Sequence, residues 1–150
     1  MLTRRTLAAA GVGFTLPVAS TAQAEEDKKP HGLAIQVSVN DPAVMTLALN
    51  NAVNVAHHYG EVGEEIEIEF VAYGPGLHML RDDTSPLKDR IKSVGQSIPN
   101  VTFTACGITM DSMKKAEGRE VILLPGVKIT QTGVVRLMEL QEKGWSYIRP

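Results

Sequence analysis

The feature that most limits how this chain can fold is a repeated change of hydrophobic period along the sequence. Apolar side chains recur at every second position in residues 33–39, 66–73 and 101–106, which is the period of a β-strand. In residues 42–58 and 87–98 they recur at three- and four-residue steps, as on one face of an α-helix. Strands that alternate with helices predict an α/β fold, a three-layer sandwich with a mostly parallel sheet, because parallel neighbours need a long crossover between them.

Capping residues and helix breakers mark the ends of the first helices. Asp41 precedes Pro42, a combination typical of an N-cap and a first helical residue. Gly60 lies where this helix is expected to end. Ser85–Pro86 predicts the start of a second helix, and Pro99–Asn100 predicts its end.

The rest of the chain is predicted to continue the alternation with shorter elements. These are a helix capped by Thr109 and ending near Glu117, a short strand or buried loop at 121–124, a short strand at 127–130, a helix opened by Thr132 or Gly133, and a final strand at 145–148. The strand at 66–73 carries glutamates in its first half, which favours a solvent-exposed position or one near the edge of the sheet.

Length and charge exclude several classes of protein. The chain has 150 residues, enough for one domain, with 15 basic and 17 acidic side chains. This balance argues against a polybasic nucleic-acid binder. A single cysteine excludes an internal disulfide and a cysteine-rich zinc site.

The first 24 residues have the pattern of an export signal. Arg4 and Arg5 precede an uncharged run of about 12 residues, and Ala22–Ala24 resembles a cleavage site. The run is too short for a spanning helix, which needs ~20 residues. The paired arginines favour a twin-arginine signal, with an ordinary secretion signal as one alternative and a retained anchor as another. We therefore expect a periplasmic protein with a flexible lead-in at 25–30, a domain at 31–150, and no membrane association after signal removal.

The carboxyl ends of parallel strands gather at one side of a sheet, and ligands bind there. Three predicted loops emerge at that side, and they contain Asn40, the segment from Tyr73 to His78, and the segment from Cys106 to Thr109. Cys106 ends a strand directly before a predicted helix, where backbone N–H groups and the helix dipole favour a thiolate. Gly107 leaves room beside the sulfur. The alternative is that Cys106 is a small buried apolar residue.

The other candidates in these loops are weaker. His78 is the best candidate acid–base partner for Cys106, or it makes a structural hydrogen bond. Gly74 and Gly76 could cradle an anion, although no P-loop lysine follows them. Cys106 and His78 provide at most two metal ligands. The nearby methionines could add soft sulfur for copper, but they are more often core residues; they are Met79, Met110 and Met113.

Taken together, several segments resemble the DsrE/DsrF-like family of small sulfur-handling proteins, in particular its exported, uncharacterised branch. The resemblance covers about residues 31–150. The segments that carry it are Val39–Pro42 with the Asn-rich helix that follows, Val71–Leu77, Phe103–Met110, Gly133–Leu137 and Gly144–Pro150. The resemblance implies a compact α/β sandwich that assembles into trimers or hexamers. Characterised members are cytoplasmic and carry sulfur as a persulfide on a cysteine that ends a central strand, and Cys106 occupies the matching position.

The expected function is therefore a periplasmic sulfur-carrier or sulfurtransferase-like protein that needs no cofactor. Cys106 would accept the sulfur, the backbone amides from Gly107 to Thr109 would stabilise its charge, and His78 would orient or deprotonate the donor. The partner would be a small sulfur donor or a sulfur-carrier protein, and Cys106 should be accessible to it. The alternative is a non-catalytic oligomeric module that binds a small anion or metal ion between Asn40, Gly76 and His78, with a structural cysteine. Copper binding is a third hypothesis.

Overall fold

A computed structural model describes residues 29–150 of the chain. The predicted export signal and residues 25–28 of the predicted lead-in lie outside the described residues. Within the described range, no helix combines the length and apolar character that crossing a membrane requires.

Five strands form a single sheet in the order β4-β3-β2-β1-β5, and every neighbouring pair is parallel. The strands are β1 (His31–Val37), β2 (Ile66–Ala72), β3 (Val101–Cys106), β4 (Lys128–Thr130) and β5 (Ser146–Ile148). The predicted α/β class and parallel sheet are confirmed.

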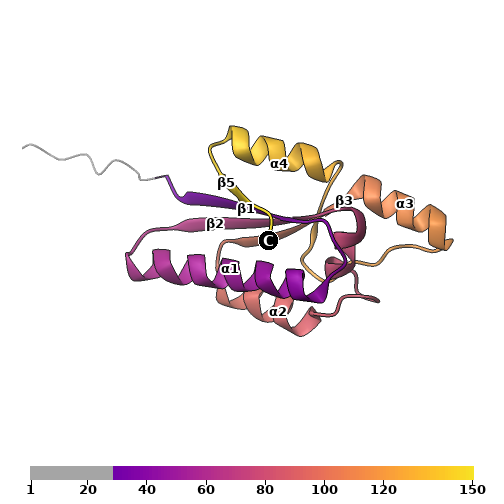
Figure 1. The fold of residues 1–150 in the computed structure, drawn as a ribbon, viewed down its shortest axis with the longest axis horizontal. Coiled ribbons are helices and arrows are strands. Elements are labelled where there is room, and N and C mark those ends of the chain that lie inside the picture. Colours follow the sequence, from indigo (N-terminus) through magenta and orange to yellow (C-terminus); the bar gives the residue numbers. More distant parts are fainter. Residues whose placement is uncertain (1–28) are drawn as a thin grey trace, which may run out of the picture.

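The helices lie on both faces of this sheet (Figure 1). They are α1 (Pro42–Glu61), the 3₁₀ helix η1 (Gly74–Leu80), α2 (Lys88–Ser97), α3 (Gly107–Glu117) and α4 (Gly133–Glu142). In Figure 1, α1 and α2 cover one face, α4 alone lies over the other, and α3 extends beyond the carboxyl ends of the strands. The three layers are therefore unequal, with two helices against one.

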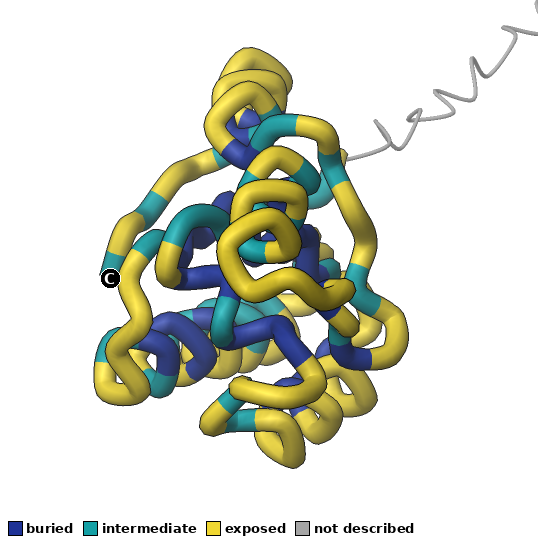
Figure 2. Tube along the Cα trace, turned by 90° about the vertical axis from the view of Figure 1, so that its right-hand side faces the viewer, coloured by how far each residue is buried: buried dark blue, intermediate teal, exposed yellow. Residues whose placement is uncertain are grey.

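The main core lies between the sheet and the α1–α2 layer, where Figure 2 shows buried chain in the interior. The period-two side chains of the three long strands meet the apolar face of α1 there. This core includes Leu33, Ile35, Val37, Ile68, Phe70, Phe103, Met45 and Leu49. The opposite face has a smaller cluster beneath α4, made of Ala34, Val71, Leu137 and Leu140. Most of the hydrophobic stabilisation therefore comes from the two-helix side.

The expectation that β2 lies in a solvent-exposed position or near the edge of the sheet was wrong about its place in the sheet, because β2 is the central strand, between β1 and β3. Glu67 is exposed, but Glu69 is buried on the α4 face. Arg136 of α4 donates from Nε and Nη2 to the two carboxylate oxygens of Glu69, over 2.8 and 2.6 Å. Thr104 Oγ1 also donates to Glu69, over 2.8 Å. A bidentate arginine therefore lets an acidic side chain occupy the centre of the sheet.

Several element boundaries also differ from the predicted ones. The first strand covers 31–37 rather than 33–39, and α2 begins at Lys88 rather than at Ser85–Pro86. Of the two alternatives for residues 121–124, the structure has the loop, with Val121 and Leu124 buried, and Leu123 makes an isolated antiparallel bridge with Arg81. The predicted turn after β2 is the 3₁₀ helix η1. These differences concern short segments whose conformation depends on tertiary contacts.

A buried arginine joins η1 to α3. Arg81 follows η1 and is 0% exposed. Its guanidinium donates to both carboxylate oxygens of Asp83 over 2.8 and 2.9 Å, and to both of Glu117 over 2.5 and 2.8 Å. The pKa of Asp83 is lowered to about 2, mainly because Arg81 donates hydrogen bonds to its carboxylate. The cluster fixes the segment after β2 against the end of α3, and both elements border Cys106.

Candidate functional site

Cys106 lies at the amino ends of two helices. It is the last residue of β3 and the N-cap residue of α3, which begins at Gly107, two residues before the predicted Thr109 cap. Its sulfur also accepts a hydrogen bond from the backbone N–H of Gly133, the first residue of α4, over 3.2 Å. The positive ends of two helix dipoles therefore meet at one sulfur atom, and each favours a negative charge there.

Hydrogen bonding outweighs burial in setting the acidity of this thiol. Burial raises the pKa of Cys106, because a buried thiolate loses hydration. The hydroxyl of Thr109 and the backbone N–H groups of Gly133, Thr109 and Ile108 lower the pKa by hydrogen bonding to the sulfur. The net direction is downward, so the site stabilises the thiolate.

Thr109 connects the thiol to the segment after β2. The backbone N–H of Gly74 donates to Thr109 Oγ1 over 2.9 Å. Because the hydroxyl oxygen accepts from Gly74, its own proton can be directed to the sulfur of Cys106. The structure thus brings together two of the three loops expected at the carboxyl ends of the strands.

The sulfur is covered rather than open at the edge of the sheet. Cys106 is 5% exposed, which differs from our expectation that it is accessible. A Cβ atom on Gly133 would lie 3.1 Å from Cβ of Tyr73 and 3.3 Å from Cβ of Cys106, and a Cβ atom on Gly107 would lie 3.2 Å from the Thr130 oxygen. The cover forms because the chain leaving β4 crosses the end of β3 before it begins α4. Glycines at both positions permit this close packing.

His78 makes its hydrogen bond away from the sulfur. It lies half-buried on η1, and its Nδ1 atom is 2.8 Å from Thr84 Oγ1. The backbone N–H of Gly133 donates to the sulfur instead, and the hydroxyl of Thr109 is the side-chain donor that lowers its pKa. Thr109 therefore takes the position beside the sulfur that we expected His78 to take.

The glycine-rich segment packs against β1. Gly76 is buried, and a Cβ atom there would lie 2.2 Å from the carbonyl oxygen of Val37. Gly74 has a φ of +52°, a conformation that favours glycine. Asn40 is exposed in the connection between β1 and α1. Close packing and backbone conformation explain both glycines without a ligand.

The described residues contain no group of three or more His, Cys, Asp or Glu side chains placed to hold a metal ion. Met79 is buried in the main core, and Met110 and Met113 pack against it. Met113 also accepts a 3.5 Å hydrogen bond from Arg81 through its sulfur. The three methionines are therefore explained by packing.

Sequence reasoning placed the segment that begins at Tyr73 near Cys106 and Thr109, but it did not connect Gly133 with them. Gly133 was expected only as a helix start, and it lies 27 residues from Cys106 along the chain. No local pattern indicates that α4 begins on top of the sulfur.

Comparisons with known proteins support the fold. No family model matches the chain, and no curated protein matches it. Among solved structures, the chain is similar to MTH1491, a protein of unknown function from Methanobacterium thermoautotrophicum. The identity is 29%, the TM-score is 0.68, and the match covers 80% of this chain and 99% of that one. The similarity extends over nearly the whole archaeal protein and indicates a shared α/β architecture.

Proposed function

We propose that this protein carries a sulfane sulfur atom on Cys106. The observation that supports the proposal is the position of its sulfur at the amino ends of α3 and α4, where the backbone N–H of Gly133 donates to it over 3.2 Å and the Thr109 hydroxyl and nearby backbone N–H groups lower its pKa. Such a position stabilises a thiolate, the nucleophilic form of cysteine. It would likewise stabilise the charge of a persulfide formed at the same place.

The transfer needs no external oxidant. The Cys106 thiolate attacks the outer sulfur of a donor R–S–SH, the donor S–S bond breaks, and the R–S⁻ thiolate leaves. The products are Cys106–S–SH and R–S⁻, so atoms and charge balance. Because Cys106 is 5% exposed, the donor reaches it when Tyr73 and the start of α4 move apart. The cover would then shield the bound sulfur from other thiols.

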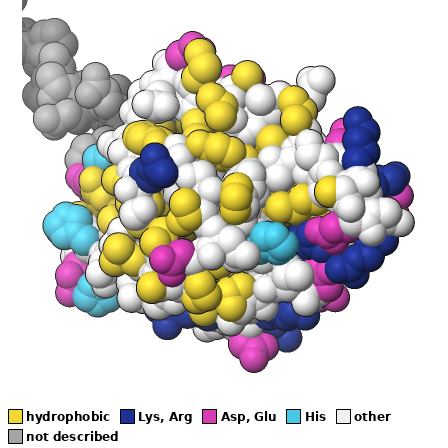
Figure 3. Space-filling model, turned by 45° about the vertical axis from the view of Figure 1, so that its right-hand side comes forward, with side chains coloured by type: hydrophobic (Ala, Val, Ile, Leu, Met, Phe, Trp, Pro, Cys, Tyr) yellow, Lys and Arg dark blue, Asp and Glu magenta, His cyan; other side chains and the backbone are white. Residues whose placement is uncertain are grey.

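The resemblance to the DsrE/DsrF-like family agrees with this chemistry and extends it. It implies a trimer or hexamer, and a sulfur-carrier protein or a small sulfur compound as partner. The predicted export signal would place the protein in the periplasm. Figure 3 shows hydrophobic side chains over α4, a surface suited to self-association. They include Val134, Val135 and Met138, each about half exposed.

Mass spectrometry of the intact protein tests the proposal. After incubation with inorganic polysulfide and removal of the excess, the folded protein should gain the mass of one sulfur atom. Cys106→Ser should gain none, and Thr109→Val, which keeps the cysteine, should load more slowly. The same treatment in denaturant shows whether the reagent can modify the exposed thiol. An adduct in denaturant with none on the folded protein would refute the proposal.

The low exposure of Cys106 favours one alternative, a structural cysteine in a non-catalytic oligomeric module. In that case a thiol-specific label should react with the native protein only as fast as the protein unfolds. Under the sulfur-carrier proposal, labelling should be much faster than global unfolding, because a local opening suffices.

A further inference from the structure

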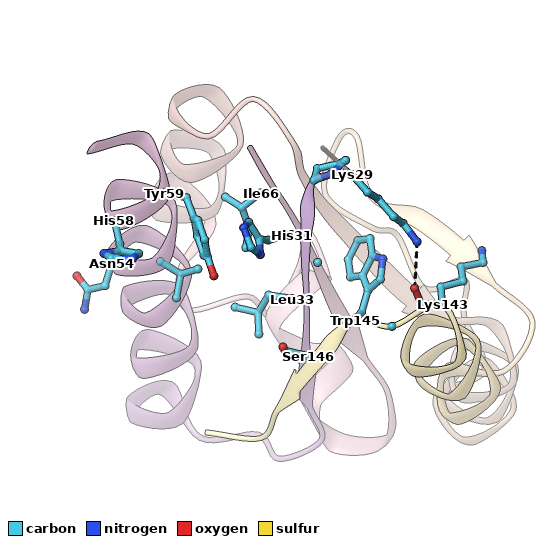
Figure 4. Close-up of a pocket in the computed structure, with 14 residues that line it drawn as sticks. Lys29, His31, Leu33, Asn54, His58, Tyr59, Ile66, Lys143, Trp145 and Ser146 are labelled. Carbon is cyan, nitrogen blue, oxygen red and sulfur yellow. Dashed lines mark hydrogen bonds between the residues drawn. The ribbon is translucent and has the colours of Figure 1, made fainter. Parts of the chain in front are cut away.

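A cavity lies at the opposite end of the sheet from Cys106. It has a volume of about 550 Å³ and lies between the carboxyl end of α1 and the segment that connects α4 to β5 (Figure 4). Small-molecule sites typically enclose roughly 300–1,000 Å³. The cavity is therefore large enough for a compact ligand.

The unequal lengths of β1 and β5 create this space. β5 pairs only with residues Leu33–Ile35 of β1, so the first two residues of β1 extend past it. Trp145 precedes β5 and lies against Gly32, where a Cβ atom would be 2.4 Å from the indole ring. Only glycine allows this contact. The indole is consequently held against the strand as a fixed wall of the cavity.

Aromatic rings also form the other side of the cavity. Tyr59 of α1 and His31 of β1 are stacked, with ring centroids 4.1 Å apart and an interplanar angle of 27°. His31 is held by a 2.8 Å contact between its Nε2 atom and Glu64 Oε2. In Figure 4 the two stacked rings lie on one side of β1, together with Leu33 and Ile66, and Trp145 lies on the other side. Trp145 packs against the cluster beneath α4, whereas Leu33, Ile66 and Tyr59 belong to the main core. The cavity therefore passes around the amino end of β1 and offers an aromatic surface on each side of the strand.

The charged side chains that line the cavity itself are basic, and the nearest carboxylate, that of Glu64, is paired with His31. The lining of the cavity includes Lys29 and Lys143 and, among the described residues, no Asp or Glu, although the chain has more acidic than basic side chains. Lys29 Nζ donates to the backbone carbonyl of Lys143 over 3.2 Å, which holds the ammonium at the rim. This hydrogen bond uses one of the three N–H donors of the Lys29 ammonium. An anionic group on a ligand would therefore find cationic donors at the rim.

We propose that this cavity binds a small planar aromatic molecule that carries an anionic group. The ring packs against Trp145, on the side of β1 where Lys29 and Lys143 lie, and the anionic group faces these lysines. Cys106 lies at the carboxyl end of β3, whereas the cavity lies at the amino end of β1. The site is thus separate from the thiol and does not depend on the proposed sulfur transfer.

The single tryptophan of the chain makes this site directly observable. Anilinonaphthalene sulfonate is a planar aromatic anion that accepts excitation energy from tryptophan. Added to the folded full-length protein, it should bind saturably and show energy transfer from Trp145. The uncharged phenylnaphthylamine should bind more weakly. Trp145→Phe should keep the binding, measured by direct excitation of the dye, and lose the energy transfer.

Charge variants decide the class of ligand. The double variant Lys29→Gln/Lys143→Gln should weaken binding of the sulfonate about fivefold and leave binding of the uncharged dye unchanged. Lys92→Gln, an exposed lysine of α2 outside the cavity, is the matched control and should bind like the wild type. Equal affinity of the wild type and the double variant, or binding without energy transfer from Trp145, would overturn the proposal. Cys106→Ser should bind the dye normally, which separates this test from that of the sulfur carrier.

Discussion

Burial raises the pKa of the Cys106 thiol and hydrogen bonding lowers it, and the hydrogen bonds together have the larger effect. Part of this effect comes from backbone N–H groups, which a substitution can displace but not delete. The side-chain contribution comes from the hydroxyl of Thr109. Thr109 is therefore the residue through which the acidity of the thiol can be tested.

Thr109→Val should raise the pKa of Cys106, because it removes the hydroxyl donor and keeps a branched side chain of similar size. A hydrogen bond to a charged group contributes roughly 1.5–3 kcal/mol, so the thiolate fraction below the pKa should fall about tenfold or more. Ultraviolet absorbance of the thiolate against pH measures the change. Thr109→Ser keeps the hydroxyl and should titrate like the wild type. Equal titration of the valine and serine variants would contradict the assigned role.

Gly133→Ala should destabilise the fold by about 1–3 kcal/mol, because the added methyl group meets Tyr73 and Cys106 in a packed region. It should also raise the pKa of Cys106 by moving the N–H of residue 133 away from the sulfur. Chemical denaturation and thiolate titration measure the two effects. Gly95→Ala is the matched control, since its Cβ atom would meet only Phe103 at 4.0 Å. In α2 this change should be neutral or stabilising by up to ~1 kcal/mol. Similar losses for both variants would argue against the packing explanation.

At the scale of elements, the hydrophobic period predicted the three long strands and α1 from local sequence. Residues 101–106 form a strand with the predicted bounds, and the Asp41–Pro42 pattern does begin a helix, with Asp41 accepting from the N–H of Ala43. The position of β2 was missed because its buried glutamate, Glu69, is paired with Arg136, 67 residues away along the chain. Local patterns cannot reveal such a partner.

Arg81, Asp83 and Glu117 form the Arg81 cluster, which joins η1 to α3. The contribution of this cluster to the free energy of unfolding depends on pH. Asp83 has a pKa of about 2, below the value of about 4 expected in the unfolded chain. Its ionisation therefore stabilises the folded protein above pH ~4, and this contribution is lost as the pH falls toward about 2. The free energy of unfolding should drop more steeply over this range in the wild type than in Asp83→Asn. Asp111→Asn, an exposed change on α3, should behave like the wild type. Parallel pH profiles for wild type and Asp83→Asn would refute the role of the cluster.

At the scale of the molecule, α4 alone covers one face of the sheet and presents apolar side chains to solvent. With the family resemblance, this predicts a trimer or hexamer in solution. Light scattering should give a multiple of the chain mass for the wild type and a lower mass for Val135→Lys/Met138→Lys, because two charges in an apolar contact oppose association. Ile122→Lys changes a residue of similar exposure outside α4 and is the control. A wild-type mass of one chain would contradict the prediction.

Part of the candidate site could be predicted from local sequence, and the rest depends on residues that are distant along the chain. Cys106 and Thr109 could be predicted because a strand end and a helix start are adjacent in the sequence. The cover of the sulfur could not, because it depends on how Gly133 and Tyr73 pack across the sheet. The same reason hid the cavity near Trp145, because one of its walls depends on how that ring packs on Gly32.

Both outer strands, β4 and β5, are only three residues long. An extended peptide or an unfolded neighbour that approached either border would find few unpaired backbone groups, too few to nucleate a fibril. Lys128 adds a charge at one border. The native protein should consequently resist amyloid-type aggregation at high concentration, even though its central strands are rich in β-branched residues.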